Sequence, residues 1–473
     1  MSRPLKIILV TVGLVVGLLV GVAVALLVFD PVGRKTRAEA AASAYIGMDV
    51  RVEGQVLVDF FPLRIVLEDV YIRNRGVDVA TAGAIRLGVD LLALLWGQLR
   101  VDHLALERLR LSIVRGDDGT LNVAEPRTAA QPLPSGNLAH VSLTQATLVY
   151  SDSQSGGAVQ AEECNVQLRD LRLAEGNPAE FMRRVSFAAE GACTEVRRNG
   201  LSTFDVKLSV HGNAGIIDLQ PVTMVLFGGQ GTGDVRADYS GAVPRYAARY
   251  TLTLFQIEEF FNALWPRKVA QGQMTLSTTL SMQGSTFSDM RRSLQGQVSL
   301  RGENLMLLGT DIDQTFSDYE SSQNFNLVDL GAFLFAGPLG LIVTKGYNFA
   351  GVVQGSEGTS EIRTLVSHWQ VDDGVARAQD VAMATNENRI ALRGELDFGN
   401  RRFQHVTVAL IDTDGCALVQ QELNGPFENP AVEKPSILTS LAGPALGLLK
   451  KGRELFADGE CEVFYQGTVM PQK

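Results

Sequence analysis

This chain of 473 residues has few aromatic residues, and its charge balance does not suit the binding of nucleic acid. Lys and Arg number 42 against 52 Asp and Glu, which gives a net charge of −10. Neutralising nucleic-acid phosphates requires clustered basic residues, so we expect no nucleic-acid partner. Aromatic residues make up 7% of the chain and hydrophobic residues 46%. The apolar content is therefore mainly aliphatic, which suits an aliphatic core or a surface for lipid tails.

The sequence also lacks the common motifs of catalysis, metal binding and nucleotide binding. Its five histidines have no metal-ligand spacing to one another or to a cysteine. No GxSxG elbow is present, and the glycine-rich run at residues 228–233 has no strand–loop–helix context and reads as a turn. Asp311, Asp313 and Asp318 fit a calcium loop poorly, because Phe316 stands where an EF-hand needs glycine. We therefore expect no enzyme, no cofactor and no metal, and we nominate no catalytic residue.

Cysteines are few, and none of them stands in a CxxC spacing. Cys164 and Cys193 flank one strand-like region, and Cys416 and Cys461 flank the C-terminal region. Two local disulfides would close loops of about 30 to 45 residues and contribute roughly 3.5 to 4 kcal/mol each in the chain-entropy model. Such bonds persist only in an oxidising compartment. The alternative is four buried thiols.

One long hydrophobic run is present, at residues 7–29, and it contains no charged residue and no proline. As a helix it would span about 34 Å, compared with about 30 Å for the hydrocarbon core of a bilayer. We therefore expect a membrane anchor in residues 1–33. A cleaved signal peptide is the alternative, because small-x-small sites follow at residues 38–40 and 42–44, but the run is longer than a usual signal core.

Most of the remaining chain has the alternation typical of β-strands. Residues 34–46 form the exception, an alanine-rich stretch that predicts a short helix ended by Gly47. Further short helices are predicted at three places, and the clearest loop is predicted at residues 127–137. Since no long helix alternates with the strands, we expect a mainly β fold with an antiparallel sheet and not a parallel α/β fold. The three further helices are predicted at 256–265, 326–336 and 444–456.

A spacing of apolar residues, Φ-x-Φ-x-x-Φ-x-Φ, recurs along the chain. Each half alternates with the period of a strand, and the extra residue between the halves shifts the phase. An added residue turns all later side chains to the other face unless a bulge absorbs the shift. We therefore predict long strands, each bent at one bulge, that keep one face apolar. Four clear copies and one weaker copy occur, at 65–72, 104–111, 141–148, 166–173 and 376–383.

Several short segments accompany the hydrophobic run and the helix predicted at 34–46. They are FDP at 29–31, GMDV at 47–50, VDLLALLWGQL at 89–99, VDHL at 101–104, IVRGDDGTLNV at 113–123, LQGQV at 294–298, GTDI at 309–312 and LNGPFENP at 423–430. In this order, these features together resemble the AsmA family of envelope proteins. The polar, acidic stretch with tyrosine that the family shows after its Asp-Pro pair is absent from this chain.

The resemblance implies a single-pass anchor in the inner membrane and a body in the periplasm of a Gram-negative cell. It also implies a long curved β-sheet that forms a groove with an apolar inner face, along which relatives are thought to pass phospholipid tails. The family supplies no catalytic residue. On this basis we divide the chain into an anchor (1–33), an AsmA-like N-terminal β region (34–130), a β-rich groove body (131–415) and a C-terminal capping region (416–473).

The residues themselves are consistent with a lipid conduit. A sheet with one apolar face must bury that face, and the few short helices give little cover. Acyl chains could fill the groove, and each buried CH₂ would contribute about 0.8 kcal/mol. The expected function is therefore phospholipid transfer that supports the outer membrane, and the alternative is an envelope assembly or regulatory factor that binds other envelope proteins. The leucines expected to line the groove are Leu104, Leu106, Leu109, Leu111, Leu168 and Leu171.

Overall fold

The structure is a computed structural model, and it forms two compact units. The N-terminal unit contains residues 1–226 and 232–244, and the C-terminal unit contains residues 227–231 and 245–473. The predicted anchor in residues 1–33 lies outside the described residues, and among those that are described no helix is long and apolar enough to span a membrane. The structure describes residues 34–60, 63–89, 101–123, 136–154, 156–173, 181–264, 270–309, 311–314, 358–437 and 463–471.

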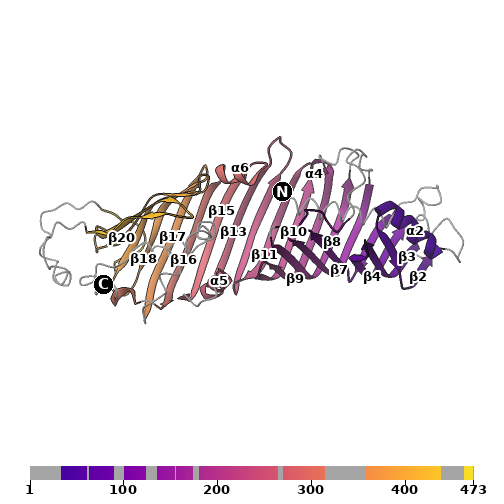
Figure 1. Cartoon of the computed structure of the whole chain (residues 1–473), viewed down its shortest axis with the longest axis horizontal. Coiled ribbons are helices and arrows are strands. Elements are labelled where there is room, and N and C mark those ends of the chain that lie inside the picture. Colours follow the sequence, from indigo (N-terminus) through magenta and orange to yellow (C-terminus); the bar gives the residue numbers. More distant parts are fainter. Residues whose placement is uncertain are drawn as a thin grey trace. The chain divides into compact units, whose positions relative to one another are not determined.

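The N-terminal unit is built almost entirely from strands, which Figure 1 labels along the chain. The predicted helix at 34–46 is confirmed, and Gly47 ends it with a positive φ of 76° and an N–H that donates to the Ser43 carbonyl. The elements are α2 (Arg34–Ile46), β1 (Asp49–Val52), β2 (Val56–Phe60), β3 (Leu63–Asn74), β4 (Val77–Val89), β5 (Val101–Glu107), β6 (Arg110–Arg115), β7 (Gly136–Asp152), β8 (Gly157–Leu173), α4 (Phe181–Arg184), β9 (Val185–Arg198), β10 (Leu201–Asn213), β11 (Ile216–Leu226) and most of β12 (Gly229–Asp238).

The sheet of the N-terminal unit is mixed, so the prediction of a purely antiparallel sheet is wrong. β5 and β6 both run parallel to β7, with His103 opposite His140 and Leu111 opposite Leu148. A parallel pair needs a connection of about a dozen residues or more, and residues 116–135 are long enough for it. The predicted loop at 127–137 also ends earlier than expected, because Gly136 begins β7.

The phase shift inside the apolar repeat is absorbed within one long strand, as predicted, in the copies at 65–72, 141–148 and 166–173, whereas the copy at 104–111 is divided between β5 and β6. In the four clear copies, the second residue between the apolar pairs adopts a left-handed backbone, which L-residues other than Asn and Asp rarely visit. These residues are Asp69, Arg108, Gln145 and Asp170, with φ of 49°, 51°, 54° and 52°. All four side chains are exposed. The weaker fifth copy has a bulge instead, because His368 pairs with Asp380 while Trp369 pairs with Ala378.

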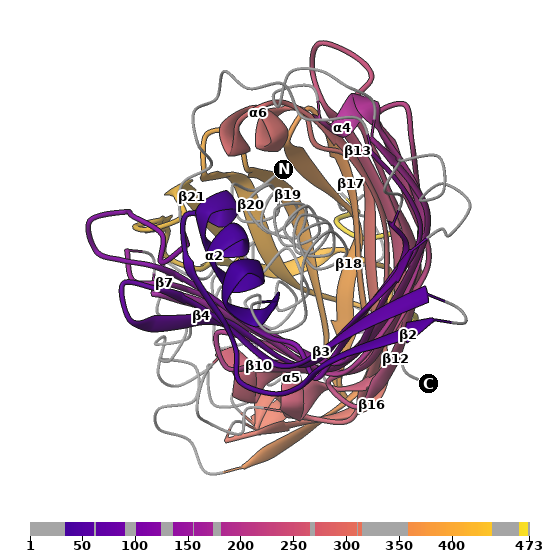
Figure 2. The ribbon, with the colours of Figure 1, turned by 90° about the vertical axis from the view of Figure 1, so that its right-hand side faces the viewer.

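The left-handed residues of neighbouring strands lie side by side across the N-terminal unit. The Arg108 N–H donates to the Thr144 carbonyl at 2.9 Å, and the Gln145 N–H donates to Asn165 Oδ1 at 3.1 Å. On the next strands, Thr194 Oγ1 donates to Glu163 Oε2 at 3.0 Å, and Glu163 itself has a φ of 49°. The bends therefore form a continuous crease. Figure 2 shows the strands of this unit as curved ribbons, with α2 on their concave side.

The C-terminal unit continues in the same style, but its described strands pair only antiparallel. The helix predicted at 256–265 is confirmed as α5, whereas those predicted at 326–336 and 444–456 lie outside the described residues. The elements are β13 (Arg245–Gln256), α5 (Ile257–Leu264), β14 (Ala270–Gln271), β15 (Gln273–Gln283), α6 (Phe287–Arg292), β16 (Gln295–Leu308), β17 (Thr359–Asp372), β18 (Val375–Ala384), β19 (Arg389–Asp397), β20 (Arg402–Ile411), β21 (Ala417–Pro426), β22 (Ala431–Val432) and β23 (Ser436–Ile437).

Candidate functional site: an apolar sheet face

One face of the N-terminal sheet carries a continuous layer of aliphatic side chains, which we call the apolar face. Ala42 of α2 packs on it and is 2% exposed. The layer follows from the period of a strand, because alternate residues point to the same side. The buried members from the sheet are Val50, Val52, Ile65, Leu67, Val70, Ile72, Val79, Ala80, Ala82, Ile85, Leu87, Leu104, Leu106, Leu109, Leu111, Ile113, Val141, Ala146 and Cys164.

The six leucines expected to line a groove all belong to this one cluster. Leu104, Leu106, Leu109 and Leu111 are 2–8% exposed, so they are core residues of the unit. Leu168 and Leu171 pack against the same cluster and are only partly buried. The sequence pattern therefore placed all six on one face, but it did not separate the filled part of that face from the open part.

Burial decreases along the apolar face from β7 towards β11. On β9 only Val185 is buried, on β10 only Gly212, and on β11 no residue is buried. The face nevertheless continues, because a Cβ at Gly191 would lie 3.4 Å from Leu208 Cδ1 and 3.7 Å from Val166 Cγ2. Leu208 in turn pairs with Val222 on β11. Strands β8–β11 therefore present apolar side chains that remain partly open to solvent.

The opposite face of the same strands is polar. Arg169 and Glu190 form an ion pair across β8 and β9 at 3.6 Å, and Arg236 and Asp218 form one at 3.1 Å. These side chains are 41–65% exposed, and such surface pairs contribute about 0–1 kcal/mol. They therefore mark this side as the solvent face without adding much stability.

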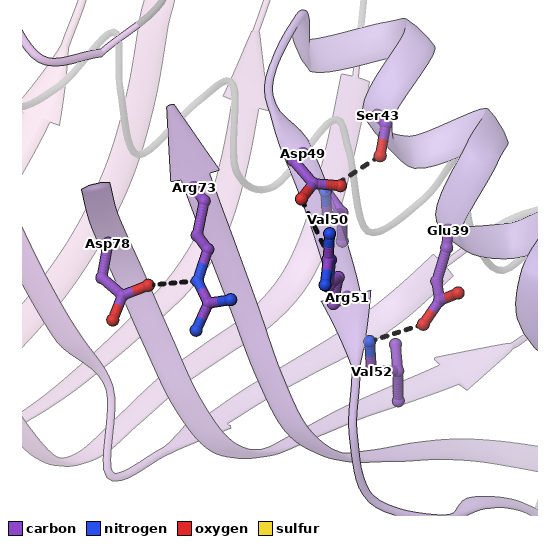
Figure 3. Close-up of polar contacts among 8 residues, drawn as sticks. All are labelled: Glu39, Ser43, Asp49, Val50, Arg51, Val52, Arg73 and Asp78. Carbon is purple, nitrogen blue, oxygen red and sulfur yellow. Dashed lines mark hydrogen bonds and ion pairs between the residues drawn. The ribbon is translucent and has the colours of Figure 1, made fainter. Parts of the chain in front are cut away.

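Helix α2 covers the edge strand β1 at the start of the sheet (Figure 3). The Val50 N–H donates to Ser43 Oγ at 2.9 Å, and the Val52 N–H donates to Glu39 Oε1 at 2.8 Å. Unpaired N–H groups on an edge strand recruit further strands, and these two helical side chains occupy them. The hollow between α2 and β1 is open, and its lining includes the charged side chains of Lys35 and Glu39.

The cysteines on the apolar face are paired. Cys164 on β8 and Cys193 on β9 form a disulfide with an S–S distance of 2.09 Å, and Cys164 is completely buried. Cys416 is also disulfide-bonded. Its expected partner, Cys461, lies outside the described residues. For Cys164 and Cys193, the structure therefore has the predicted local disulfide and not two buried thiols.

Titratable side chains do not converge on the apolar face. Among the described residues, no three His, Cys, Asp or Glu side chains gather closely enough to hold a metal ion. The structure does bring His103 and His140 together, with their rings stacked at 5.2 Å. Sequence spacing gave no sign of this pair, because it depends on the parallel alignment of β5 with β7.

A polar cluster of the C-terminal unit fixes residues 463–471 among the described residues. Tyr465 donates to Asp380, and Thr468 Oγ1 donates to the other carboxylate oxygen of Asp380 at 2.7 Å. Burial, and then the hydrogen bond to Asp380, raise the pKa of the Tyr465 hydroxyl. Arg389 donates to the Val469 carbonyl at 3.0 Å, and burial lowers its pKa. Residues 463–471, which we call the C-terminal segment, are thereby held against β18 and β19.

A sheet with a continuous apolar face, preceded in sequence by a hydrophobic run and a short helix, agrees with what the resemblance implied. The model of the AsmA family matches residues 1–180 and 192–380. This chain belongs to the AsmA family. No curated protein and no solved structure matches it. Membership of the AsmA family indicates a role connected with the cell envelope.

Proposed function

We propose that this AsmA-family protein holds phospholipid acyl chains on the apolar face of its sheet and passes them between the membranes of the cell envelope. The observation that carries the proposal is the change in burial along this face. Strands β1 and β3–β6 fill it with buried side chains of their own, while Leu168, Leu171 and Leu208 remain partly exposed. Soluble proteins rarely leave large contiguous apolar patches open, and such patches mark interaction surfaces.

The chemistry of the open stretch favours a hydrocarbon ligand. Its side chains are mainly aliphatic, and the ion pairs Arg169–Glu190 and Arg236–Asp218 lie on the opposite face. An acyl chain is recognised by the removal of apolar surface from water, which is not directional. Each buried CH₂ would contribute about 0.8 kcal/mol, so a chain could bind and slide without a fixed polar site. The proposal assigns no catalytic residue.

The proposed location is the periplasm, with an anchor in the inner membrane. The disulfide between Cys164 and Cys193 supports an oxidising compartment. The hydrophobic run at residues 7–29 supports the anchor. Phospholipids, the inner membrane and envelope proteins are the partners of this proposal.

The test is native mass spectrometry with lipid extraction on the full chain, purified in mild detergent. We expect several phospholipids per chain, and we expect Leu168→Asp to remove most of them. Leu168 pairs with Val141 and Ala189 on the apolar face, so a carboxylate there would lie against the acyl chains at a cost of several kcal/mol. The matched control is Gln167→Asp, which places the same charge on the exposed opposite face beside Arg169.

Wild-type protein that is well folded and free of lipid would refute the proposal. The apolar face would then serve protein contacts, and an envelope assembly factor would become the better interpretation. Equal lipid loading in Leu168→Asp and wild type would instead refute the placement of the lipid on this face.

A further inference from the structure

A tyrosine of the C-terminal unit places a hydroxyl group among aliphatic side chains. Tyr250 lies in the middle of β13, opposite Thr278 on β15. Ala248 and Leu252 lie two residues before and after Tyr250, and therefore on the same face of β13. They pair with Leu280 and Leu276 on β15. On β15 these inward residues are partly buried, while the intervening serines and threonines alternate outward. Tyr250 is thus, together with Thr278 and Tyr246, one of the few polar residues on a mainly aliphatic surface.

The Tyr250 hydroxyl is buried and has no hydrogen-bond partner among the residues that the structure describes. Burial raises the pKa of its phenol, so the group is a neutral O–H donor at physiological pH. The contrast with Tyr465 is clear, because that buried hydroxyl both donates to Asp380 and accepts from the Val469 N–H. A buried polar group without a partner destabilises the fold, and most such groups in proteins are satisfied. The orphan donor therefore indicates a missing acceptor.

The surroundings of Tyr250 define the acceptor. None of the neighbours just described on this face carries a charge, and none is a cation that could accompany a carboxylate or a phosphate. Moving an anion into such surroundings is costly, whereas a neutral carbonyl oxygen is accommodated. In a phospholipid, the ester carbonyls are the neutral acceptors that lie directly at the start of the acyl chains.

From this geometry we infer that the Tyr250 hydroxyl donates a hydrogen bond to an ester carbonyl of a diacyl lipid bound along the C-terminal unit. The inference rests on the proposed function, and it adds a point of chemical selection to an otherwise non-directional surface. Hydrocarbon alone would bind at this position less well than an ester lipid. The hydrogen bond would also favour one depth of the ester groups relative to β13 and β15.

The experiment compares two lipids that differ only at the ester carbonyls. The full chain in detergent is incubated with an equimolar mixture of dipalmitoyl phosphatidylethanolamine and its diether analogue, and the bound ratio is measured by mass spectrometry. We expect wild type to prefer the diester lipid, and Tyr250→Phe to lower the diester-to-diether ratio about two- to tenfold, as loss of one hydrogen bond predicts. The control is Tyr246→Phe, because Tyr246 lies on the same face of β13 and has an interaction partner of its own.

Each outcome separates this inference from the proposed function. If both lipids bind and the ratio is the same in wild type and Tyr250→Phe, the inference is overturned and the lipid-binding function stands. Equal loss of the preference in Tyr246→Phe would also overturn the assignment to Tyr250. If no variant and no wild-type protein binds either lipid, both fail. Hydrogen exchange of β13 in the lipid-free proteins should be no faster in Tyr250→Phe than in wild type, and faster exchange would reveal a protein partner for the hydroxyl and refute the inference.

Discussion

Replacing Gln145 by glycine should stabilise the middle of β7, although glycine normally weakens a strand. Gln145 has a φ of 54°, in the left-handed region, and its side chain is exposed. A non-glycine residue there costs about 1–2 kcal/mol, while glycine costs about 0.5–1 kcal/mol through the entropy of the unfolded chain. The N–H that donates to Asn165 Oδ1 is kept. The expected net gain is about 0.5–1 kcal/mol.

The matched control is Thr147→Gly, two residues further along the same strand. Thr147 lacks a positive φ, so glycine there should destabilise the strand by about 0.5–1 kcal/mol. The assay is hydrogen exchange of the β7 and β8 amides in the full chain, which reports local stability. Exchange should slow about two- to fivefold in Gln145→Gly and quicken by a similar factor in Thr147→Gly.

Faster exchange in both variants would refute the reasoning. It would show that the left-handed bend at Gln145 is not a source of strain in this strand. The bends at Asp69, Arg108 and Gln145 could then no longer be explained as strained backbone conformations that keep one face of the sheet apolar.

Three further predictions concern stability. Replacing Cys164 and Cys193 by alanine removes a cross-link between residues 29 positions apart and should lower the free energy of unfolding by about 3.6 kcal/mol in the chain-entropy model. The variant should therefore have a lower denaturation midpoint than wild type under oxidising conditions and the same midpoint under reducing conditions. Leu106→Asp buries a carboxylate at a position 4% exposed and should cost at least about 4 kcal/mol, so it should lose cooperative unfolding while Leu168→Asp keeps it. Tyr465→Phe should speed exchange in the C-terminal segment about tenfold, because a hydrogen bond to the charged Asp380 is lost. Because the pKa of Tyr465 is raised in the folded protein, the stability that this hydroxyl contributes is fully present below the tyrosine pKa of the unfolded chain, about 10, and is lost as the pH rises further. In wild type, exchange of the C-terminal segment, corrected for its intrinsic pH dependence, should therefore become faster only at alkaline pH.

Local patterns carried much of the fold. The helix at 34–46 and its end at Gly47 follow from composition and from glycine's tolerance of positive φ. The strands and their bends follow from the period of two and the single extra residue in each apolar repeat. The short helices α4 and α6 were missed, although Thr286 and Asp289 form a capping box at the start of α6 that the sequence could have indicated.

The six candidate leucines were placed on one face for the same local reason, since a side chain's face depends on its position within its own strand. Their burial could not be predicted, because it depends on what lies above that face. Leu106 is fully buried and Leu168 only partly buried, although both occupy the second apolar position of the same spacing. The predicted domain boundaries after residues 130 and 415 remain predictions. The structure itself divides the chain into two compact units.

The sequence by itself thus determined which residues form strands, where those strands bend and which side of each is apolar, because these properties depend on neighbours within a few positions. Only the tertiary structure decided that β5 lies parallel to β7 and stacks His103 on His140. It also decided that Asp380 contacts Tyr465 and that the Tyr250 hydroxyl has no hydrogen-bond partner in the described part of the chain. Those facts depend on the path of the chain between strands, because that path brings residues far apart in sequence into contact and sets the partners available to each polar group.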